Sequence, residues 1–400
     1  MILEKIIVFT PIYVSIFWSI VFFANHYSAN KPRYFLGVFM ATTAILYICH
    51  AFFFLGFKAL YLKTDSLYLF SSLSVFPLYY IYVLLLTRDT SIKKIHFIHF
   101  LPAIILGFSL LVSQLISTTE DKLAYYQSAL LQNNWPLAGA SLSTITMSAL
   151  FFTSRLIFGI QAFVYLLLGY SLAKKYNYRI ANFYSNLEGR ELVWVKLLSI
   201  TFLITALASI VANIAGRGSF MHHNWLLAIP SLVFSTLLFT IGLLGNKQNF
   251  TVKGLEADKE NEAETILEEK ENVYCTTNLL NRTQQRNETL KREVLKLLKE
   301  KKIYLNPELK ITEMCKMLST NRTYLSGFIN QEFELSFNEL INSYRVHQAV
   351  SILKTNNNDL TLNDIAIASG FGSVSSLNRV FKNHTGSTIS HYKQKHINTP

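Results

Sequence analysis

Long apolar runs, separated by short polar segments, dominate the first 245 residues of the chain. A helix needs about 20 apolar residues to cross the hydrocarbon core of a bilayer. Seven runs approach or exceed this length and predict helical spans at Lys5–Phe23, Tyr34–Phe57, Ser66–Leu86, His96–Ile116, Met147–Leu172, Leu192–Ala215 and Trp225–Leu244. The pattern therefore predicts an all-α protein in which a polytopic seven-helix transmembrane bundle, residues 1–245, precedes a soluble, all-helical part.

Charge density rises after residue 245. Residues 1–245 hold 16 Lys/Arg and 7 Asp/Glu, whereas residues 246–400 hold 21 and 18. The stretch from Glu256 to Glu271 is acidic and poor in apolar residues, which is typical of a solvated helix or a flexible tether. We therefore assign residues 246–290 as an acidic, charged connector.

Basic residues in the short loops indicate the orientation of the bundle. If the C-terminus is cytoplasmic, seven spans place the N-terminus outside, and the inner segments then carry nine Lys/Arg against five in the outer segments. This bias agrees with the count of seven. We expect a multi-pass protein of the lipid bilayer, in a bacterial-type inner cell membrane, with a cytoplasmic C-terminal domain.

Arg155 lies inside the fifth expected span, where a charge is costly and by default indicates function. No Asp or Glu occurs within another expected span to pair with it. Snorkelling to the nearby outer interface explains Arg155 without a ligand. The alternative is an unknown small anionic ligand, or another membrane signal, held by Arg155 with Lys58, Arg217 or the pair His222 and His223.

Other chemistry has little support in the sequence. It contains no phosphate-binding loop, nucleophile elbow or paired intramembrane carboxylates, so we expect neither an enzyme nor a cofactor. The three cysteines lack the spacing of metal ligands, and two adjacent histidines are a weak metal signal, so no metal is expected. The outer segment Ser117–Thr146, with Tyr125 and Tyr126, is interpreted as an interfacial loop with its rings at the headgroups. The alternative is part of an extracellular pocket, formed by these tyrosines with Trp135 and a small acidic cluster.

A helix-turn-helix pattern is found in "LTLNDIAIASGFGSVSSLNRVFKNHTG", residues 360–386. Thr361 and Asp364 form the pattern of a capping box, Gly370 allows a turn with positive φ, and Ser373 is a helix N-cap. The next helix has one apolar side and one small, polar and basic side, which suits the major groove. Its expected DNA-binding residues are Ser375, Ser376, Asn378, Arg379 and Lys382.

The same arrangement occurs earlier, in "LKITEMCKMLSTNRTYLSGFINQEF", residues 309–333. Asn321 is the expected N-cap of its second helix, whose expected DNA-binding residues are Arg322, Thr323, Ser326 and Asn330. A linker helix at about 336–354 joins the two units. Periodicity alone favours ordinary surface helices, but a duplicated unit and the net charge of +7 over residues 272–400 favour a nucleic acid partner.

These residues resemble the AraC family of transcription regulators over about Tyr304–Lys395. The second unit carries the resemblance in Ile365, Ala366, Gly370, Phe371, Ser375, Arg379, Phe381, Lys382, Gly386 and Tyr392, and the linker helix carries it in Arg345 and Ala349. The resemblance implies two helix-turn-helix units, in a domain at 291–400, that bind double-stranded promoter DNA and activate or repress transcription. Ile389 stands where the family usually has proline. Gly327 occupies a position that is often basic.

We therefore predict a membrane-bound one-component transcription regulator that senses a signal in or across the membrane and acts on an operator, with homodimer formation on DNA as one means of control. The alternative is a membrane receptor or transporter-like protein whose C-terminal helices bind a protein partner. A third interpretation is that the spans tether the regulator and sense nothing.

Overall fold

The computed structural model describes residues 2–24, 31–88, 92–188, 224–247, 279–355 and 360–396, with a few single positions between 200 and 211. Every named element in this part of the chain is a helix, in agreement with the expected all-α class. The chain forms two compact units, which we call the bundle unit, 1–174 with 192–252, and the C-terminal unit, 175–191 with 253–400.

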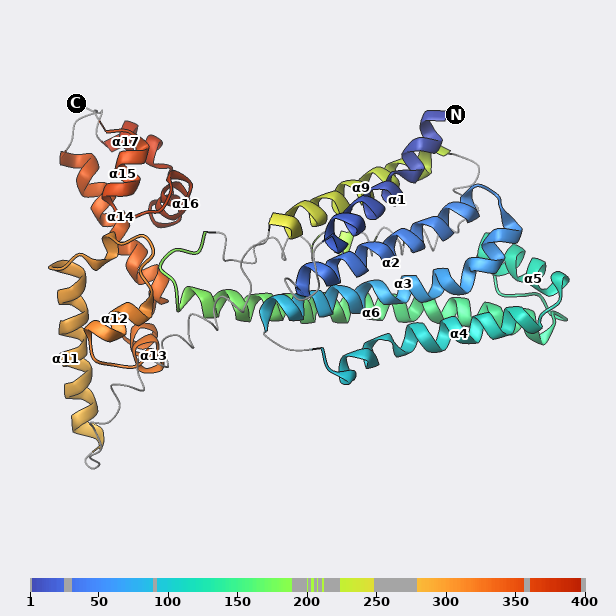
Figure 1. The fold of residues 1–400 in the computed structure, drawn as a ribbon, viewed down its shortest axis with the longest axis horizontal. Helices are drawn as coiled ribbons and strands as arrows, with labels where there is room; N and C mark the ends of the chain where they lie inside the picture. Colours follow the sequence, from blue (N-terminus) through green and yellow to red (C-terminus); the bar gives the residue numbers. More distant parts are fainter. Residues whose placement is uncertain are drawn as a thin grey trace. The chain divides into compact units, whose positions relative to one another are not determined.

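Long apolar helices make up the bundle unit (Figure 1). Helix α1 packs against α2 and α9, and α3 packs against α2 and α4. The bounds of the elements are α1 (Ile2–Phe23), α2 (Lys31–Phe54), α3 (Lys58–Thr87), η1 (Lys94–Phe100), α4 (Leu101–Ile116), α5 (Thr119–Tyr125), η2 (Tyr126–Leu131), α6 (Leu142–Ala181) and α9 (Asn224–Lys247).

Five helices in the described residues are long and apolar enough to cross a membrane, fewer than the seven that the sequence predicted. They are Lys31–Phe54, Lys58–Thr87, Lys94–Ile116, Leu142–Ala181 and Leu227–Asn246. The first expected span corresponds to a shorter apolar segment, Phe9–Phe23. The sixth, Leu192–Ala215, lies mostly outside the described residues.

Asp65 corrects the expectation that no acidic residue lies within the spans. Helix α3 begins at Lys58, well before the expected start at Ser66, so Asp65 is part of a continuous apolar helix and is only 2 % exposed. The hydroxyls of Tyr61 and Tyr125 donate hydrogen bonds to its two carboxylate oxygens, at 2.7 and 2.9 Å. Because a buried carboxylate is costly without donors, these two tyrosines account for its position.

The outer segment is also different from the expected interfacial loop. It forms α5 and a π-helical turn, η2, and the rings of Tyr125 and Tyr126 are buried in an aromatic core with Phe53 and Phe151. The rings therefore pack inside the bundle unit and do not face a headgroup layer.

The C-terminal unit contains the two helix-turn-helix units. Helices α12 and α13 form the first, α15 and α16 form the second, and α14 joins them (Figure 1). The bounds are α11 (Leu279–Lys299), η4 (Ile303–Leu305), α12 (Ile311–Met317), α13 (Arg322–Glu332), α14 (Phe337–Thr355), α15 (Leu362–Ala368), α16 (Val374–Thr385) and α17 (Ile389–His396). Residues 175–188, which lie within the expected bundle range 1–245, belong to this unit.

The expected caps are confirmed. The side chains of Asn321, Thr361 and Ser373 accept hydrogen bonds from backbone N–H groups of the first turns of α13, α15 and α16. Asp364 closes the capping box with the backbone N–H of Thr361 at 3.0 Å. Gly370, between α15 and α16, has φ +82°, as the tight turn requires.

We predict that Gly370→Ala destabilises the C-terminal unit by about 2–4 kcal/mol, because left-handed strain and overpacking each cost about 1–3 kcal/mol. A Cβ at this position would lie 2.5 Å from the carbonyl oxygen of Tyr304 and 2.7 Å from Leu305 Cα. Hydrogen exchange of the α14 and α16 amides in the full chain measures this loss.

Gly327→Ala is the matched control. Gly327 lies inside α13, is exposed, and has no neighbour within 4 Å of an added Cβ. Alanine at this position should raise the free energy of opening measured by hydrogen exchange, by up to about 1 kcal/mol, because alanine has a higher helix propensity than glycine. Similar effects of the two substitutions would contradict the assigned turn.

Candidate nucleic-acid interface

Helix α16 has one buried side and one exposed side, and most of its expected DNA-binding residues are accessible. Ser375, Arg379 and Lys382 are exposed, and Asn378 is half-buried. Ser376 is the exception: it is 7 % exposed, so its expected place on the open side is wrong. The physical reason is its i, i+4 relation to Val380, which puts both side chains on the packed side of the helix.

Helix α13 is less open than α16. Thr323 is exposed, whereas Arg322, Ser326 and Asn330 are half-buried. Part of this burial comes from residues 175–188, the end of α6 and the loop after it, which we call the α6 tail.

The α6 tail contacts both ends of α13. The Arg322 guanidinium carbon lies 5.7 Å from the centre of the Phe183 ring, within the range of a cation–π contact. At the other end of α13, Asn330 Nδ2 donates a hydrogen bond to the Tyr178 hydroxyl at 3.4 Å.

Backbone hydrogen bonds attach the α6 tail to the segment before α12. Ser185 N–H donates to the carbonyl of Leu309 at 3.1 Å, and Ile311 N–H donates to the carbonyl of Phe183 at 3.0 Å. Tyr184 and Lys310 lie opposite each other in an antiparallel bridge. The tail is also deeply packed, since Phe183, Tyr184 and Ser185 are all at most 1 % exposed.

Arg345, on the linker helix α14, fixes the tail from the other side. Its guanidinium donates to the backbone carbonyl and the hydroxyl of Ser185, at 3.1 and 3.0 Å. It also donates to the carbonyls of Tyr304 and Asn306, both at 2.7 Å. Burial lowers the pKa of Arg345 to about 10, opposed by the charge of Glu308, so the group stays protonated at neutral pH.

The last described residue of the tail reaches the second helix-turn-helix unit. Ser373, the N-cap of α16, donates its hydroxyl proton to Glu188 Oε2 at 2.6 Å. The Asn186 side chain, from the same tail, lies beside Gly372 in the turn before α16. The tail therefore contacts the N-terminal ends of both recognition helices, Arg322 of α13 and Ser373 of α16.

Sequence reasoning missed these tail residues. They lie in "YNYRIANFYSNLEG", residues 176–189, between the fifth and sixth expected spans, which is an inner segment in the expected orientation. The available signal was its content of four aromatic residues, which is unusual for a solvated loop but does not identify a partner.

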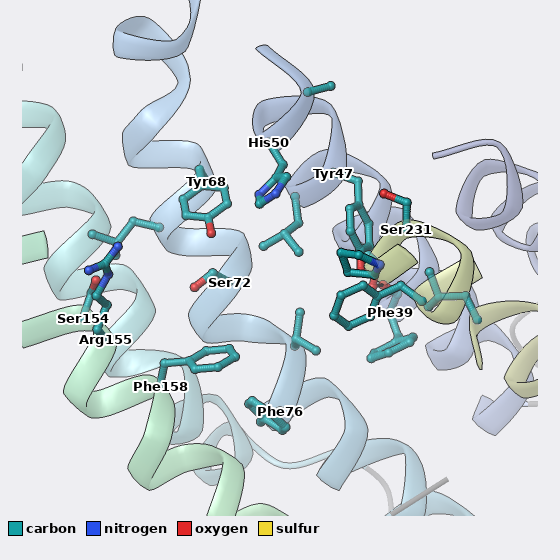
Figure 2. Close-up of a pocket in the computed structure, with 18 of the residues that line it drawn as sticks. Phe39, Tyr47, His50, Tyr68, Ser72, Phe76, Ser154, Arg155, Phe158 and Ser231 are labelled. Carbon is teal, nitrogen blue, oxygen red and sulfur yellow. Dashed lines mark hydrogen bonds between the residues drawn. The ribbon is translucent and has the colours of Figure 1, made fainter. Parts of the chain in front are cut away.

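A pocket in the bundle unit contains Arg155. Residues of α2, α3, α6 and α9 line it, and its volume is about 220 Å³. In Figure 2, Arg155 and Ser154 lie on one side, Phe39, Tyr47 and Ser231 lie on the other, and the polar groups of His50, Tyr68 and Ser72 lie between them. The wall thus combines a buried cation and hydroxyls with aromatic rings.

The structure changes the expected partners of Arg155. Its guanidinium stacks 3.9 Å from the centre of the Phe151 ring and donates a hydrogen bond to the side-chain oxygen of Asn133. Asp65 and His50 share the pocket wall with it. Lys58 does not line the pocket, and Arg217, His222 and His223 lie outside the described residues. The described residues contain no cluster of three or more His, Cys, Asp or Glu with the geometry of a metal site.

Comparisons with known proteins bear on the C-terminal unit. A family model described as a helix-turn-helix domain matches residues 314–395. An uncharacterized HTH-type transcriptional regulator of Bacillus subtilis (strain 168), YtdP, is 34 % identical over 88 residues, which are 22 % of this chain and 11 % of that protein. No solved structure matches. Residues 314–395 are therefore a helix-turn-helix domain of the AraC type.

Proposed function

We propose that this chain is a membrane-bound one-component transcription regulator whose C-terminal unit binds specific promoter DNA. The observation that carries the proposal is the pair of capped helix-turn-helix units joined by α14, with Arg379 and Lys382 exposed on α16. A recognition helix with an exposed basic side fits the major groove. Two such units joined by one linker helix fit two stretches of the major groove that are about one turn of the DNA double helix apart.

Membrane attachment is supported by the five long apolar helices and by the excess of Lys/Arg in the expected inner loops. In the proposed orientation, the bundle crosses the inner membrane of a bacterial-type cell and the C-terminal unit is cytoplasmic, where the DNA is. We also propose that two copies of the chain bind as a homodimer, each copy on one of two adjacent half-sites of the operator.

The bundle pocket is the proposed sensing site. A buried guanidinium favours an anionic group, and aromatic walls favour an apolar body, so the expected ligand is a small amphipathic anion. Such a ligand changes DNA binding only if its affinity differs between two states of the bundle. Helix α6 carries both Arg155 and the tail residue Tyr178, so one element joins the pocket to the DNA-binding unit.

We predict that Arg379→Ala weakens specific DNA binding by about 1–3 kcal/mol, as expected for loss of a bidentate contact to a guanine edge. Lys382→Ala should weaken binding to all sequences and reduce the salt slope by about one unit, because it removes a phosphate contact. Gel shifts of the full chain on its own upstream DNA and on random DNA, over a salt series, measure both effects.

Lys354→Ala, which removes an exposed lysine outside both recognition helices, is the control for lost charge. Unchanged affinity and unchanged sequence preference in Arg379→Ala would remove Arg379 as a base reader. Absence of any specific, salt-dependent binding by the unaltered chain would instead favour a protein partner for the C-terminal unit.

For the pocket, we predict that decanoate raises the melting temperature of the full chain in nanodiscs more than decanol does, because only decanoate supplies an anion to Arg155. Arg155→Gln should abolish the difference between the two compounds. Lys63→Gln, which removes an exposed cation of α3 outside the pocket wall, should keep it. Equal stabilisation by the acid and the alcohol in the unaltered chain would contradict an anion site at Arg155.

A further inference from the structure

The contacts of the α6 tail fall into two groups with different consequences. The first group is buried: Ser185 is hydrogen-bonded by Arg345 and, at 2.6 Å, by Asn338 Nδ2, and Phe183 is 0 % exposed. The second group lies at the surface, where Glu188 accepts from Ser373 and Tyr178 accepts from Asn330. Breaking the first group exposes buried polar groups, whereas breaking the second exchanges single hydrogen bonds with water.

The surface group contacts residues that DNA itself would need. A helix-turn-helix protein places the N-terminal part of its recognition helix against the bases, and helix N-termini are common sites for backbone phosphates. Asn330 of α13, which was expected to contact DNA, bonds Tyr178, and Ser373 at the start of α16 bonds Glu188.

The carboxylate of Glu188 resembles a DNA phosphate in its negative charge and in its acceptor oxygens. This carboxylate accepts the hydroxyl of the α16 N-cap, beside the positive end of a 12-residue helix, which is where a phosphate oxygen of bound DNA is expected. A carboxylate there imitates one phosphate contact and repels the DNA backbone by its charge.

We propose that the surface contacts of the α6 tail compete with DNA for the recognition helices α13 and α16. In the docked state, Glu188 occupies the N-terminal end of α16 and Tyr178 holds Asn330 of α13, and both contacts lower DNA affinity. DNA binding requires Glu188 and Tyr178 to leave, while the buried anchor at Ser185 and Arg345 keeps the tail attached to the unit. This proposal rests on the proposed DNA-binding function.

The location of the tail defines what can control this competition. Tyr178 lies on α6, and the loop that follows carries Phe183 and Glu188. Movement of the end of α6 therefore acts directly on the surface contacts and does not depend on the acidic connector 246–290. The tail is thus a second path from the bundle to the DNA-binding unit.

The first test is the DNA affinity of Glu188→Gln in the full chain, held in nanodiscs and measured on the DNA fragment that the unaltered chain prefers. Glu188 is exposed, so the substitution leaves the core of the unit unchanged. We expect its affinity to rise by roughly 3- to 10-fold, because one charge-assisted hydrogen bond and one like-charge repulsion are removed.

Glu300→Gln is the matched control, since it removes the same charge from an exposed position at the end of α11, outside both recognition helices. It should give a much smaller rise. An equal rise in the two variants would show a general charge effect and overturn the proposal. A fall in the affinity of Glu188→Gln would also overturn it, because the tail would then hold the unit in its DNA-binding form.

A cross-link tests the competition without relying on an affinity gain. In Glu188→Cys with Ser373→Cys, a disulfide should lock the tail onto the start of α16, and specific DNA binding should be lost and then return on reduction. Each single cysteine variant should bind DNA equally with and without oxidant. Full DNA binding by the cross-linked chain would overturn the proposal.

These experiments distinguish failure of the proposed DNA-binding function from failure of the proposed competition by the α6 tail. If the unaltered chain and all variants show no specific DNA binding, the proposed function fails and the competition fails with it. If the unaltered chain binds specifically but Glu188→Gln and the cross-link leave its affinity unchanged, the competition alone is wrong.

Discussion

The buried guanidinium of Arg345 is the constraint on which the C-terminal unit depends. It lies on α14, is 1 % exposed, and donates to Ser185 of the α6 tail and to the carbonyls of Tyr304 and Asn306 before α12. A buried charge without such acceptors costs several kcal/mol, so the three stretches of chain must come together when the unit forms. Their meeting makes the end of α6 an integral part of the DNA-binding unit.

Helix α6 extends from the bundle unit into the C-terminal unit. Its bundle part places Arg155 in the wall of the pocket, and its C-terminal part supplies Tyr178 of the tail. A continuous helix is stiff, so a displacement of the bundle part of α6 reaches Tyr178 directly. In the proposed mechanism, α6 is therefore the path that couples a membrane signal to DNA binding.

Local sequence patterns predicted the parts of this structure that depend on local physics. The caps at Asn321, Thr361 and Ser373, and the positive φ of Gly370, follow from residue types within one turn of the chain. Helical periodicity likewise predicted the exposure of Arg379 and Lys382. It was wrong for Ser376, whose i, i+4 relation to Val380 places it on the packed side.

The features that the sequence did not predict depend on long-range contacts. Asp65 accepts one hydrogen bond from Tyr61, one helical turn away, but its second donor, Tyr125, lies 60 residues along the chain, and no local pattern indicates that contact. The contact between Glu188 and Ser373 joins two loops that have no shared pattern, and the pairing of Tyr184 with Lys310 is a single bridge. Such pairings leave no periodic signal, and only the folded chain brings them together.

The central claim is that one chain is held in a membrane and binds specific DNA. The most direct measurement is to cross-link cells that contain the full-length protein, wash the membrane fraction, and map the DNA recovered with the protein. The account predicts a small set of discrete sites, which Arg379→Ala depletes. Recovery of DNA without sequence preference, or of specific sites from the soluble fraction alone, would contradict it.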